Sequence, residues 1–284
     1  MRAHPGVRMT IRTALLQGTK LLEDEAISAA RLTAEVLLMH ALQRDRAYLY
    51  AHSEDELTEL AWIHYGRYLH ERLKGKPTQY ITGHQEFYGR DFRVNRNVLI
   101  PRPETEHLVG AAIARIQPGD VVVDVGTGSG AIAITLALET AARVVATDIS
   151  IAALCVAHAN AKRLSAPVRF LACDLAASVR DHSVDILVSN PPYVPATDQP
   201  GLQREVRDYE PPVALYGGPT GLEIYERLIA DAARVLRPNG WLLLELGYNS
   251  LDPVRAMLDA NWTDIAVMHD LAGFSRVLAA RWSS

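Results

Sequence analysis

Hydrophobic residues in the first quarter of the chain recur with the spacing of α-helices. Leu32, Val36 and Met39 follow one another at intervals of four and three residues, which places them on one helical face. Beside them lie Thr33, Leu37 and Ala41, which give a broad apolar face. A second set has a similar period and includes aromatic residues: Leu57, Leu60, Ala61, Tyr65, Tyr68 and Leu69. Short helices need a partner surface to be stable. The pattern therefore predicts a small all-α N-terminal domain, which we assign to residues 1–76.

The pattern changes to short alternating segments after Pro77. Two candidate strands, Gln85–Tyr88 and Phe92–Val94, flank a turn that contains Gly89. This is the arrangement of a β-hairpin. We therefore expect a β-hairpin linker over residues 77–100.

Strands and helices alternate from Gly119 to the end of the chain. The run Val121–Val125 is apolar apart from one Asp, as expected for a strand buried on both faces. Further strands are predicted at Arg143–Asp148, Val168–Ala172, Val184–Ser189, Trp241–Leu246, Asp264–Met268 and Ser275–Arg281. This alternation predicts an α/β domain over residues 101–284 with a doubly wound parallel sheet, in which the C-terminal pair can form an antiparallel edge.

Two of the segments that connect these strands and helices have a composition that predicts their structure. The segment 190–220 is rich in Pro, Gly and Asp and lacks clear periodicity, which indicates a binding or active-site loop. The tetrapeptide Arg237–Gly240 predicts a turn before the strand at Trp241.

Composition and charge narrow the function classes. The chain has 284 residues, 49% hydrophobic and 22% charged, which is ordinary for a folded protein of this size. Its net charge of -4 argues against a protein that wraps duplex nucleic acid. The two cysteines, Cys155 and Cys173, lack metal-binding spacing, and we expect both to be buried thiols. Because no signal-peptide core or membrane-length apolar run is present, we expect a cytoplasmic protein, and a monomer by default.

A glycine-rich turn follows the first strand of the α/β domain. Its residues are Gly126, Thr127, Gly128, Ser129 and Gly130. Glycines at a strand-to-helix turn let a ligand approach the backbone at the helix N-terminus. The signal alone is ambiguous, because it also satisfies a dinucleotide fingerprint and a tight turn without ligand is the alternative.

The next predicted strand ends at Asp148. A carboxylate at this position can accept hydrogen bonds from ribose hydroxyls. NAD and S-adenosylmethionine both carry that ribose, so Asp148 does not choose between them. The alternative is a turn residue or helix N-cap, a role for which Ser150 competes.

The fourth strand ends in Asn190-Pro191-Pro192-Tyr193, an NPPY motif at the edge where open α/β sheets bind ligands. An amide or exocyclic amine nitrogen is a poor nucleophile because its lone pair is delocalised. Two acceptors, the Asn190 side-chain oxygen and the Pro191 carbonyl, can hold its N–H groups so that the lone pair faces a methyl donor. The prolines keep the carbonyl aimed, and Tyr193 can form a wall beside the sulfonium. The alternative is a proline-rich strand exit.

These features together resemble methyltransferases that act on planar nitrogens. Longer stretches closely resemble the HemK family, the peptide chain release factor glutamine methyltransferases. They are Pro77–Gly83, Glu86–Tyr88, Val98–Glu106, Glu210–Gly218 and Asp270–Leu278. The resemblance runs from about residue 10 to the end and is strongest after residue 77.

The resemblance implies a class I S-adenosylmethionine-dependent methyltransferase domain, Rossmann-like with a seven-stranded sheet. It implies N5-methylation of the glutamine in the Gly-Gly-Gln motif of class I release factors, which act in translation termination. By motif, residues 126–130, Asp148 and Asn190 contact S-adenosylmethionine, and Asn190 to Tyr193 hold the glutamine. Asp174 is followed by Leu175 where the family often has an aromatic residue, so an aliphatic side chain is expected against the adenine. Thr220 replaces the family's usual Asp and is assigned no site role.

The predicted chemistry is direct methyl displacement without a metal or a covalent intermediate. Three rival functions remain open from the sequence: a nucleic acid base methyltransferase, a glutamine methyltransferase for a ribosomal protein, and a nucleotide-binding oxidoreductase or non-catalytic module. The helical domain either binds the release factor or only forms a core. The net charge disfavours the first rival.

Overall fold

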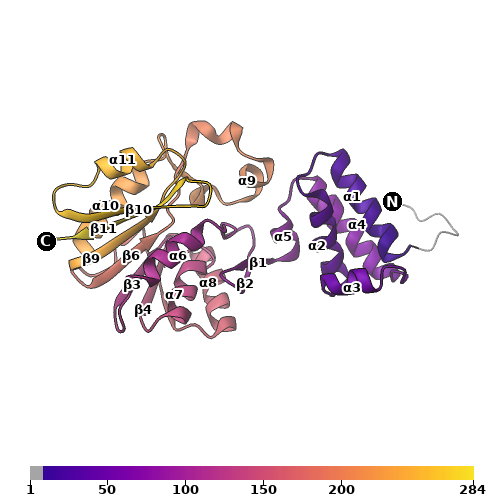
Figure 1. The fold of residues 1–284 in the computed structure, drawn as a ribbon, viewed down its shortest axis with the longest axis horizontal. Helices are drawn as coiled ribbons and strands as arrows, with labels where there is room; N and C mark the ends of the chain where they lie inside the picture. Colours follow the sequence, from indigo (N-terminus) through magenta and orange to yellow (C-terminus); the bar gives the residue numbers. More distant parts are fainter. Residues whose placement is uncertain (1–8) are drawn as a thin grey trace. The chain divides into compact units, whose positions relative to one another are not determined.

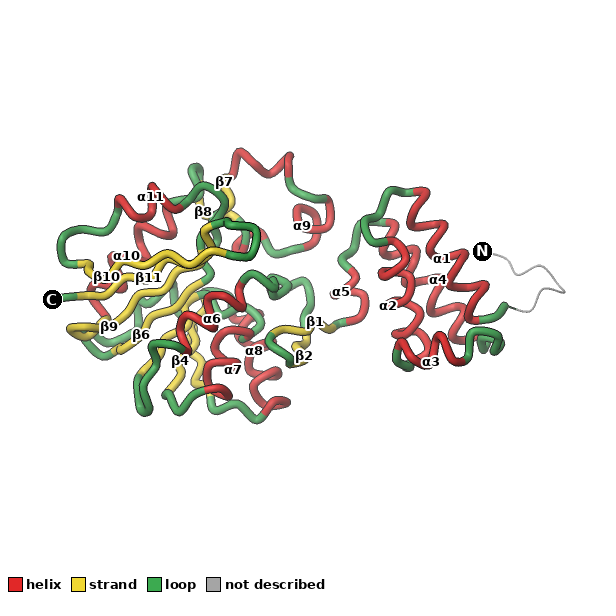
Figure 2. The backbone as a smooth tube through the Cα atoms, in the orientation of Figure 1, coloured by secondary structure: helices red, strands yellow, loops and turns green. Residues whose placement is uncertain are grey.

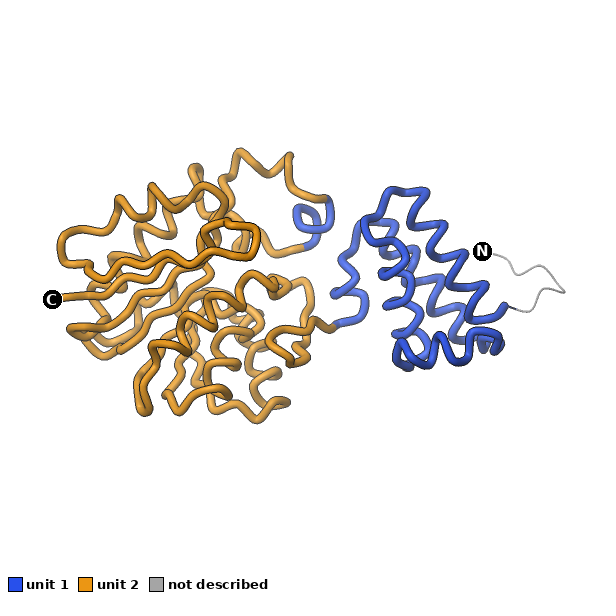
Figure 3. Tube along the Cα trace, in the orientation of Figure 1, with its two compact units in different colours: residues 1–83, 204–209 blue, residues 84–203, 210–284 orange. Residues whose placement is uncertain are grey.

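The computed structural model describes residues 9–284, so the first eight residues of the predicted helical domain lie outside it. The chain forms two compact units (Figure 3). The first unit ends at Gly83 and also includes Arg204–Tyr209, whereas the second comprises His84–Gln203 and Glu210–Ser284. The helical unit thus extends beyond the predicted end at residue 76. The reason is α5 (Thr78–Thr82), which buries Tyr80 and Ile81.

The first unit is helical, as expected. Its other helices from the N-terminal part of the chain are α1 (Ile11–Asp24), α2 (Ala30–Leu42), α3 (Arg46–Ala51) and α4 (Glu59–Leu73) (Figure 1). Side chains of Thr10, Asp45 and Thr58 cap three of these helices by accepting a hydrogen bond from a backbone N–H in the first turn. Leu37, Leu38 and Tyr65 are fully buried between the helices.

The predicted broad apolar face of α2 is buried only in part. Leu32 is 52% exposed, and the fully buried residues of α2 are Ala34, Leu37 and Leu38. Apolar residues surround most of this helix, so their period does not select one face. Packing against α1 and α4 selects it instead.

The second unit contains a seven-stranded sheet in the order β10-β11-β9-β6-β3-β4-β5. β11 runs opposite to the other six strands of this sheet, which confirms the doubly wound prediction and its antiparallel C-terminal pair. The strands are β3 (Val121–Val125), β4 (Arg143–Asp148), β5 (Val168–Ala172), β6 (Val184–Ser189), β9 (Leu236–Glu245), β10 (Trp262–His269) and β11 (Ser275–Trp282).

Helices cover both faces of this sheet (Figure 1). On one face lie α6 (Thr105–Ile113), α7 (Ala131–Glu139) and α8 (Ile151–Leu164), and on the other lie α10 (Glu223–Val235) and α11 (Leu251–Ala256). The strand residues alternate between the two cores: Val122 packs with the first set of helices and Val123 with the second. The hairpin of β1 (His84–Phe87) and β2 (Arg90–Arg93) adds Phe87 and Phe92 to the first core.

The predicted turn at Arg237–Gly240 lies within β9. Val184 pairs with Leu236 and Ile186 pairs with Trp241, so the residues between them form a bulge, with Asn239 at φ +69°. The expectation for Cys155 is also wrong: this residue is exposed on α8, and Cys173 is partly exposed. Both are free thiols.

The segment 190–220 contains several short elements (Figure 2). They are β7 (Val194–Pro195), the 3-10 helix η1 (Ala196–Gly201), α9 (Arg204–Tyr209), the 3-10 helix η2 (Pro212–Ala214) and β8 (Tyr216–Gly218). Within the first unit, Glu205 of α9 pairs with the buried Arg72 of α4 at 2.6 Å. Among residues 9–284, no helix is long and apolar enough to cross a membrane.

Candidate active site

The glycine-rich turn between β3 and α7 lies against the end of β4. The N–H groups of Gly126 and Thr127 both donate to the Thr147 carbonyl at 2.9 Å, and the Gly128 N–H donates to Asp148 Oδ2 at 2.9 Å. Gly126 and Gly128 have φ of +74° and +57°, a region that side chains rarely adopt. Glycine therefore lets this loop pass close to the strand end while its backbone faces open space.

Asp148 and Ser150 lie together at the turn between β4 and α8. Ser150 is the N-cap of α8, since its hydroxyl accepts a hydrogen bond from Ala153 N at 3.2 Å. Asp148 Oδ1 accepts from Ser150 N at 2.8 Å, so the carboxylate joins the glycine turn to the start of α8. Burial raises the pKa of Asp148. A carboxylate has about four lone-pair sites, which leaves Asp148 able to accept from a ligand hydroxyl.

Asp124 lies beneath the same turn and is fully buried. Its Oδ2 accepts from the Thr127 hydroxyl at 2.6 Å and from Ala133 N at 3.1 Å. Burial raises its pKa to about 7. Because the Thr127 hydroxyl is used by Asp124, this side chain supports the turn from below.

Gly130 is the one residue of the turn that does not line the open space above it. A Cβ at Gly130 would lie 2.8 Å from Ile134 Cδ1 and 3.2 Å from Ala157 Cβ. Gly126 and Gly128 have no atom within 4 Å of that position. Gly130 thus allows α7 and α8 to pack together, whereas the other two glycines leave room for a ligand.

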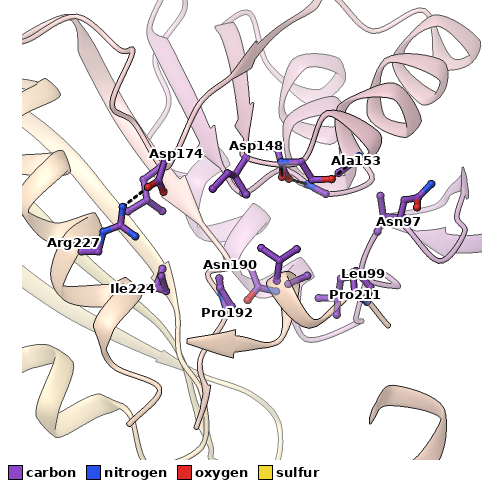
Figure 4. Close-up of a pocket in the computed structure, with 18 residues that line it drawn as sticks. Asn97, Leu99, Asp148, Ala153, Asp174, Asn190, Pro192, Pro211, Ile224 and Arg227 are labelled. Atoms are coloured by element: carbon purple, nitrogen blue, oxygen red, sulfur yellow. Dashed lines mark hydrogen bonds and ion pairs between the residues drawn. The ribbon is translucent and has the colours of Figure 1, made fainter. Parts of the chain in front are cut away.

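A cavity of about 190 Å³ opens at the carboxyl ends of the parallel strands (Figure 4). In Figure 4, Asp174 and Arg227 lie toward one end of it and Asn97 and Leu99 toward the other. Its lining residues, all from the second unit, are Asn97, Val98, Leu99, Gly126, Gly128, Asp148, Ile149, Ser150, Ala153, Asp174, Leu175, Asn190, Pro192, Pro211, Val213, Ala214, Ile224 and Arg227.

The cavity combines apolar walls with a few polar groups. Leu175 lines it as an aliphatic wall, with its backbone at φ +47° and its carbonyl bonded to the Thr147 hydroxyl at 2.9 Å. Asp174 forms an ion pair with Arg227 at 2.5 Å. An apolar cleft with convergent polar groups is typical of a cofactor site. The cavity therefore suits an organic ligand with a planar apolar part and hydroxyl groups.

Asn190 reaches the cavity from the end of β6. The preceding Ser189 anchors the strand end by donating its hydroxyl to the Val125 carbonyl at 2.8 Å. Asn190 Nδ2 donates to Thr105 Oγ1 at 3.2 Å. With its nitrogen held in this way, the amide keeps its oxygen free to accept a hydrogen bond in the cavity.

The backbone after Asn190 is enclosed by glycines. A Cβ at Gly217 would lie 2.5 Å from the Pro192 carbonyl oxygen, and one at Gly221 would lie 2.4 Å from the Tyr193 carbonyl oxygen. Val194 N also donates to the Leu215 carbonyl at 2.9 Å. These contacts hold the strand exit in one conformation, as preorganisation requires.

Pro191 and Tyr193 follow Asn190 and are not among the residues that line this cavity. Pro191 is buried, and the Tyr193 ring packs against Gly247, where a Cβ would approach it to 2.6 Å. Burial, followed by the nearby Glu245, raises the pKa of Tyr193 to about 12. Tyr193 thus remains a neutral phenol at physiological pH.

Sequence reasoning did not assign several residues that the fold brings to the site. Val98, Leu99, Pro211 and Val213 line the cavity, yet they served only as marks of the family resemblance. Thr220, which was assigned no site role, donates its N–H and its hydroxyl to Glu223 Oε1, both at 3.0 Å, just before α10. Glu210 is 3% exposed and joins the segment before α6 to the segment after α9. Its carboxylate accepts hydrogen bonds from Arg102 at 2.6 Å and from Ile100 N at 3.3 Å. No group of His, Cys, Asp and Glu among residues 9–284 could hold a metal ion.

Comparison with known proteins agrees with this arrangement. Residues 13–83 match the PrmC N-terminal domain, and residues 106–204 match the methyltransferase small domain. The fold is similar to that of a methyltransferase from Pyrococcus furiosus in its crystal structure, with a TM-score of 0.55. The match covers 70% of this chain and 91% of the Pyrococcus chain. At 20% identity this similarity concerns the fold alone.

Two relatives are similar over nearly their whole length. The release factor glutamine methyltransferase of Koribacter versatilis is 46% identical over 278 residues, which cover 96% of this chain and 99% of the relative. The protein of the same name from Moorella thermoacetica is 43% identical over 279 residues, with 96% and 98% covered. Identity at this level over both units shows that the chain belongs to the release factor glutamine methyltransferase family.

Proposed function

We propose that this chain transfers the methyl group of S-adenosylmethionine to the side-chain amide nitrogen of the glutamine in the Gly-Gly-Gln motif of class I release factors. The observation that carries the proposal is the Asn190 amide, which faces the cavity with its nitrogen already bonded to Thr105. An acceptor fixed beside a cofactor cavity is what a planar nitrogen substrate requires.

The cavity residues fit S-adenosylmethionine. Asp148 offers carboxylate lone pairs to the ribose hydroxyls, Gly126 and Gly128 leave room for the methionine part, and Leu175 offers an apolar wall to the adenine. When bound, the cofactor supplies an electrophilic methyl group on a sulfonium. Two N–H groups of the glutamine would bond to Asn190 Oδ1 and to the Pro191 carbonyl, which orients the nitrogen lone pair toward that methyl.

The mechanism is mainly one of positioning. With the cofactor bound, the amide nitrogen would displace S-adenosylhomocysteine from the methyl carbon in one step, and the extra N–H proton would be lost to water after transfer. The rigid backbone around Pro192 and the anchored Asn190 supply the alignment before the reaction. Positioning effects of this kind are worth orders of magnitude in rate.

The partner and setting follow from the same proposal. The helical unit is proposed as the region that binds the release factor, and the family match over residues 13–83 supports this role. Because release factors act during translation, we propose a cytoplasmic enzyme, and a monomer without a stably bound nucleic acid.

Mass spectrometry of a purified class I release factor tests the proposal. After incubation with the enzyme and S-adenosylmethionine, one added methyl is expected on the Gly-Gly-Gln glutamine. Asn190→Ala should lower kcat by about a hundredfold or more, with the Kd for S-adenosylmethionine changed by less than about threefold. Asn261→Ala is the matched control, because Asn261 bonds to Asp259 on the surface. Methylation of RNA or of a ribosomal protein, with none on the release factor, would overturn the substrate assignment.

A further inference from the structure

Asn190 can serve the substrate only in one orientation of its amide. The group has a donor end and an acceptor end, and a flip would present N–H groups to the N–H groups of a glutamine. The structure holds the donor end on Thr105 Oγ1 at 3.2 Å. Thr105 is the first residue of α6 and is 4% exposed. A hydroxyl can both donate and accept, so Thr105 alone does not determine the orientation.

Glu245 lies on the other side of the Thr105 hydroxyl. It is the last residue of β9 and is 3% exposed. The Thr105 side chain interacts with its carboxylate and lowers its pKa, against the larger raising effect of burial. Its Oε2 has no hydrogen-bond partner among residues 9–284. An ionised carboxylate only accepts hydrogen bonds. While Glu245 is ionised, Thr105 can only donate its proton to this carboxylate, which leaves the Thr105 lone pairs for Asn190.

We propose that Glu245 and Thr105 are positioning residues that fix the amide of Asn190 with its oxygen toward the substrate nitrogen. The inference rests on the proposed function, because it concerns the same acceptor. It assigns a role to a buried carboxylate that methyl transfer itself does not use. Neither residue touches the reacting atoms; both act through Asn190.

The ionisation state of Glu245 controls this arrangement. Burial raises its pKa to about 7. A protonated Glu245 can donate to Thr105, whose own proton is then free to donate to Asn190 Oδ1, and the amide is no longer held in the productive orientation. The other charged or titratable groups that face Glu245 are Arg102 and Glu104 before α6, Arg276 on β11, Tyr193 after β6 and Tyr225 on α10.

The test compares kcat, KM and pH profiles of the full-length enzyme with a release factor as substrate. Thr105→Val removes the hydroxyl at nearly constant volume and should lower kcat about tenfold, the effect of one lost orienting hydrogen bond. Its KM for S-adenosylmethionine should stay unchanged, and Thr105→Ser should restore most of the rate. The matched control is Thr135→Val, because the buried Thr135 bonds only within α7, to the Ala131 carbonyl at 2.7 Å.

The pH profile separates positioning from a merely structural role. The kcat of the wild type should fall as pH drops through about 7, whereas Glu245→Gln should be slower at pH 8 and lose this acid limb. Asp124 has a pKa raised to a similar value, so the acid limb should persist in Asp124→Asn. If Thr105→Val does not fold, Thr105→Ser and the Glu245→Gln profile decide the question.

Two outcomes distinguish this inference from the proposed function. A wild type that does not methylate any release factor refutes the function itself. If the wild type methylates a release factor, and Glu245→Gln and Thr105→Val keep the wild-type kcat, the positioning role of Glu245 and Thr105 is refuted while the function stands. The positioning role is also overturned if the kcat of Glu245→Gln still falls as pH drops through about 7.

Discussion

Two glycines of the β3–α7 turn should respond to the same substitution in different ways. Gly128 and Gly130 both have positive φ, +57° and +84°. An alanine at either position is strained by about 1 to 2 kcal/mol. At Gly130 the new Cβ also meets Ile134 and Ala157 at 2.8 and 3.2 Å. Such overpacking costs about 1 to 3 kcal/mol more.

These energies predict separable effects on stability and on binding. Since 1 kcal/mol shifts the Tm of a domain of this size by about 2 to 4 °C, Gly130→Ala should unfold about 2 to 12 °C below Gly128→Ala. At Gly128 the methyl group projects into the cavity, because nothing lies within 4 Å of it. Gly128→Ala should therefore weaken S-adenosylmethionine binding about tenfold or more, whereas Gly130→Ala should bind within about threefold of wild type.

Thermal unfolding followed by circular dichroism and isothermal titration with S-adenosylmethionine measure the two effects. The titration is made at 15 °C, about the temperature where small domains are most stable, so that Gly130→Ala remains folded. Equal Tm values combined with equal losses of affinity in the two variants would refute the assignment of helix packing to Gly130 and of ligand space to Gly128.

Three further substitutions test other parts of the structure. Asp148→Ala should weaken S-adenosylmethionine binding about tenfold or more in the same titration, because it removes the acceptor for ribose hydroxyls; wild-type affinity would contradict the assignment. The folded-state pKa of Asp124, about 7 against an ordinary 3.8, means that its stabilising contribution is present below 3.8 and is lost as pH rises to 7. Asp124→Asn should thus raise the free energy of unfolding at pH 8 by about 2 to 4 kcal/mol, and less as pH falls toward 4, as urea titrations at several pH values can show. Glu205→Ala leaves the buried Arg72 without its ion pair and should lower the stability of the helical unit by about 1 to 3 kcal/mol in the same titrations, and no change would contradict the pairing.

Local sequence signals determined most of the element boundaries. The predicted bounds of β3, β4, β5 and β6 agree with the structure to the residue. Continuous apolar runs mark strands buried on both faces, and Ser150 marks the start of α8 through a hydrogen bond three residues away. The alternation of these elements was sufficient to predict a doubly wound parallel sheet, because parallel strands require crossover helices.

Local signals failed where burial depended on distant partners. Leu32 and Cys155 are apolar residues within helices, yet both are exposed, since the packing of neighbouring elements decides which face is covered. The NPPY motif and Asp148 could be placed at the carboxyl edge of the sheet from strand order alone. The grouping of Asn190 with Thr105, 85 residues away, and with Glu245 could not. Hydrophobic periodicity indicates that a residue is buried but not which residues it contacts. The sequence by itself therefore determined which reactive groups lie at the strand ends, and only the tertiary structure decided which side chains orient the Asn190 amide.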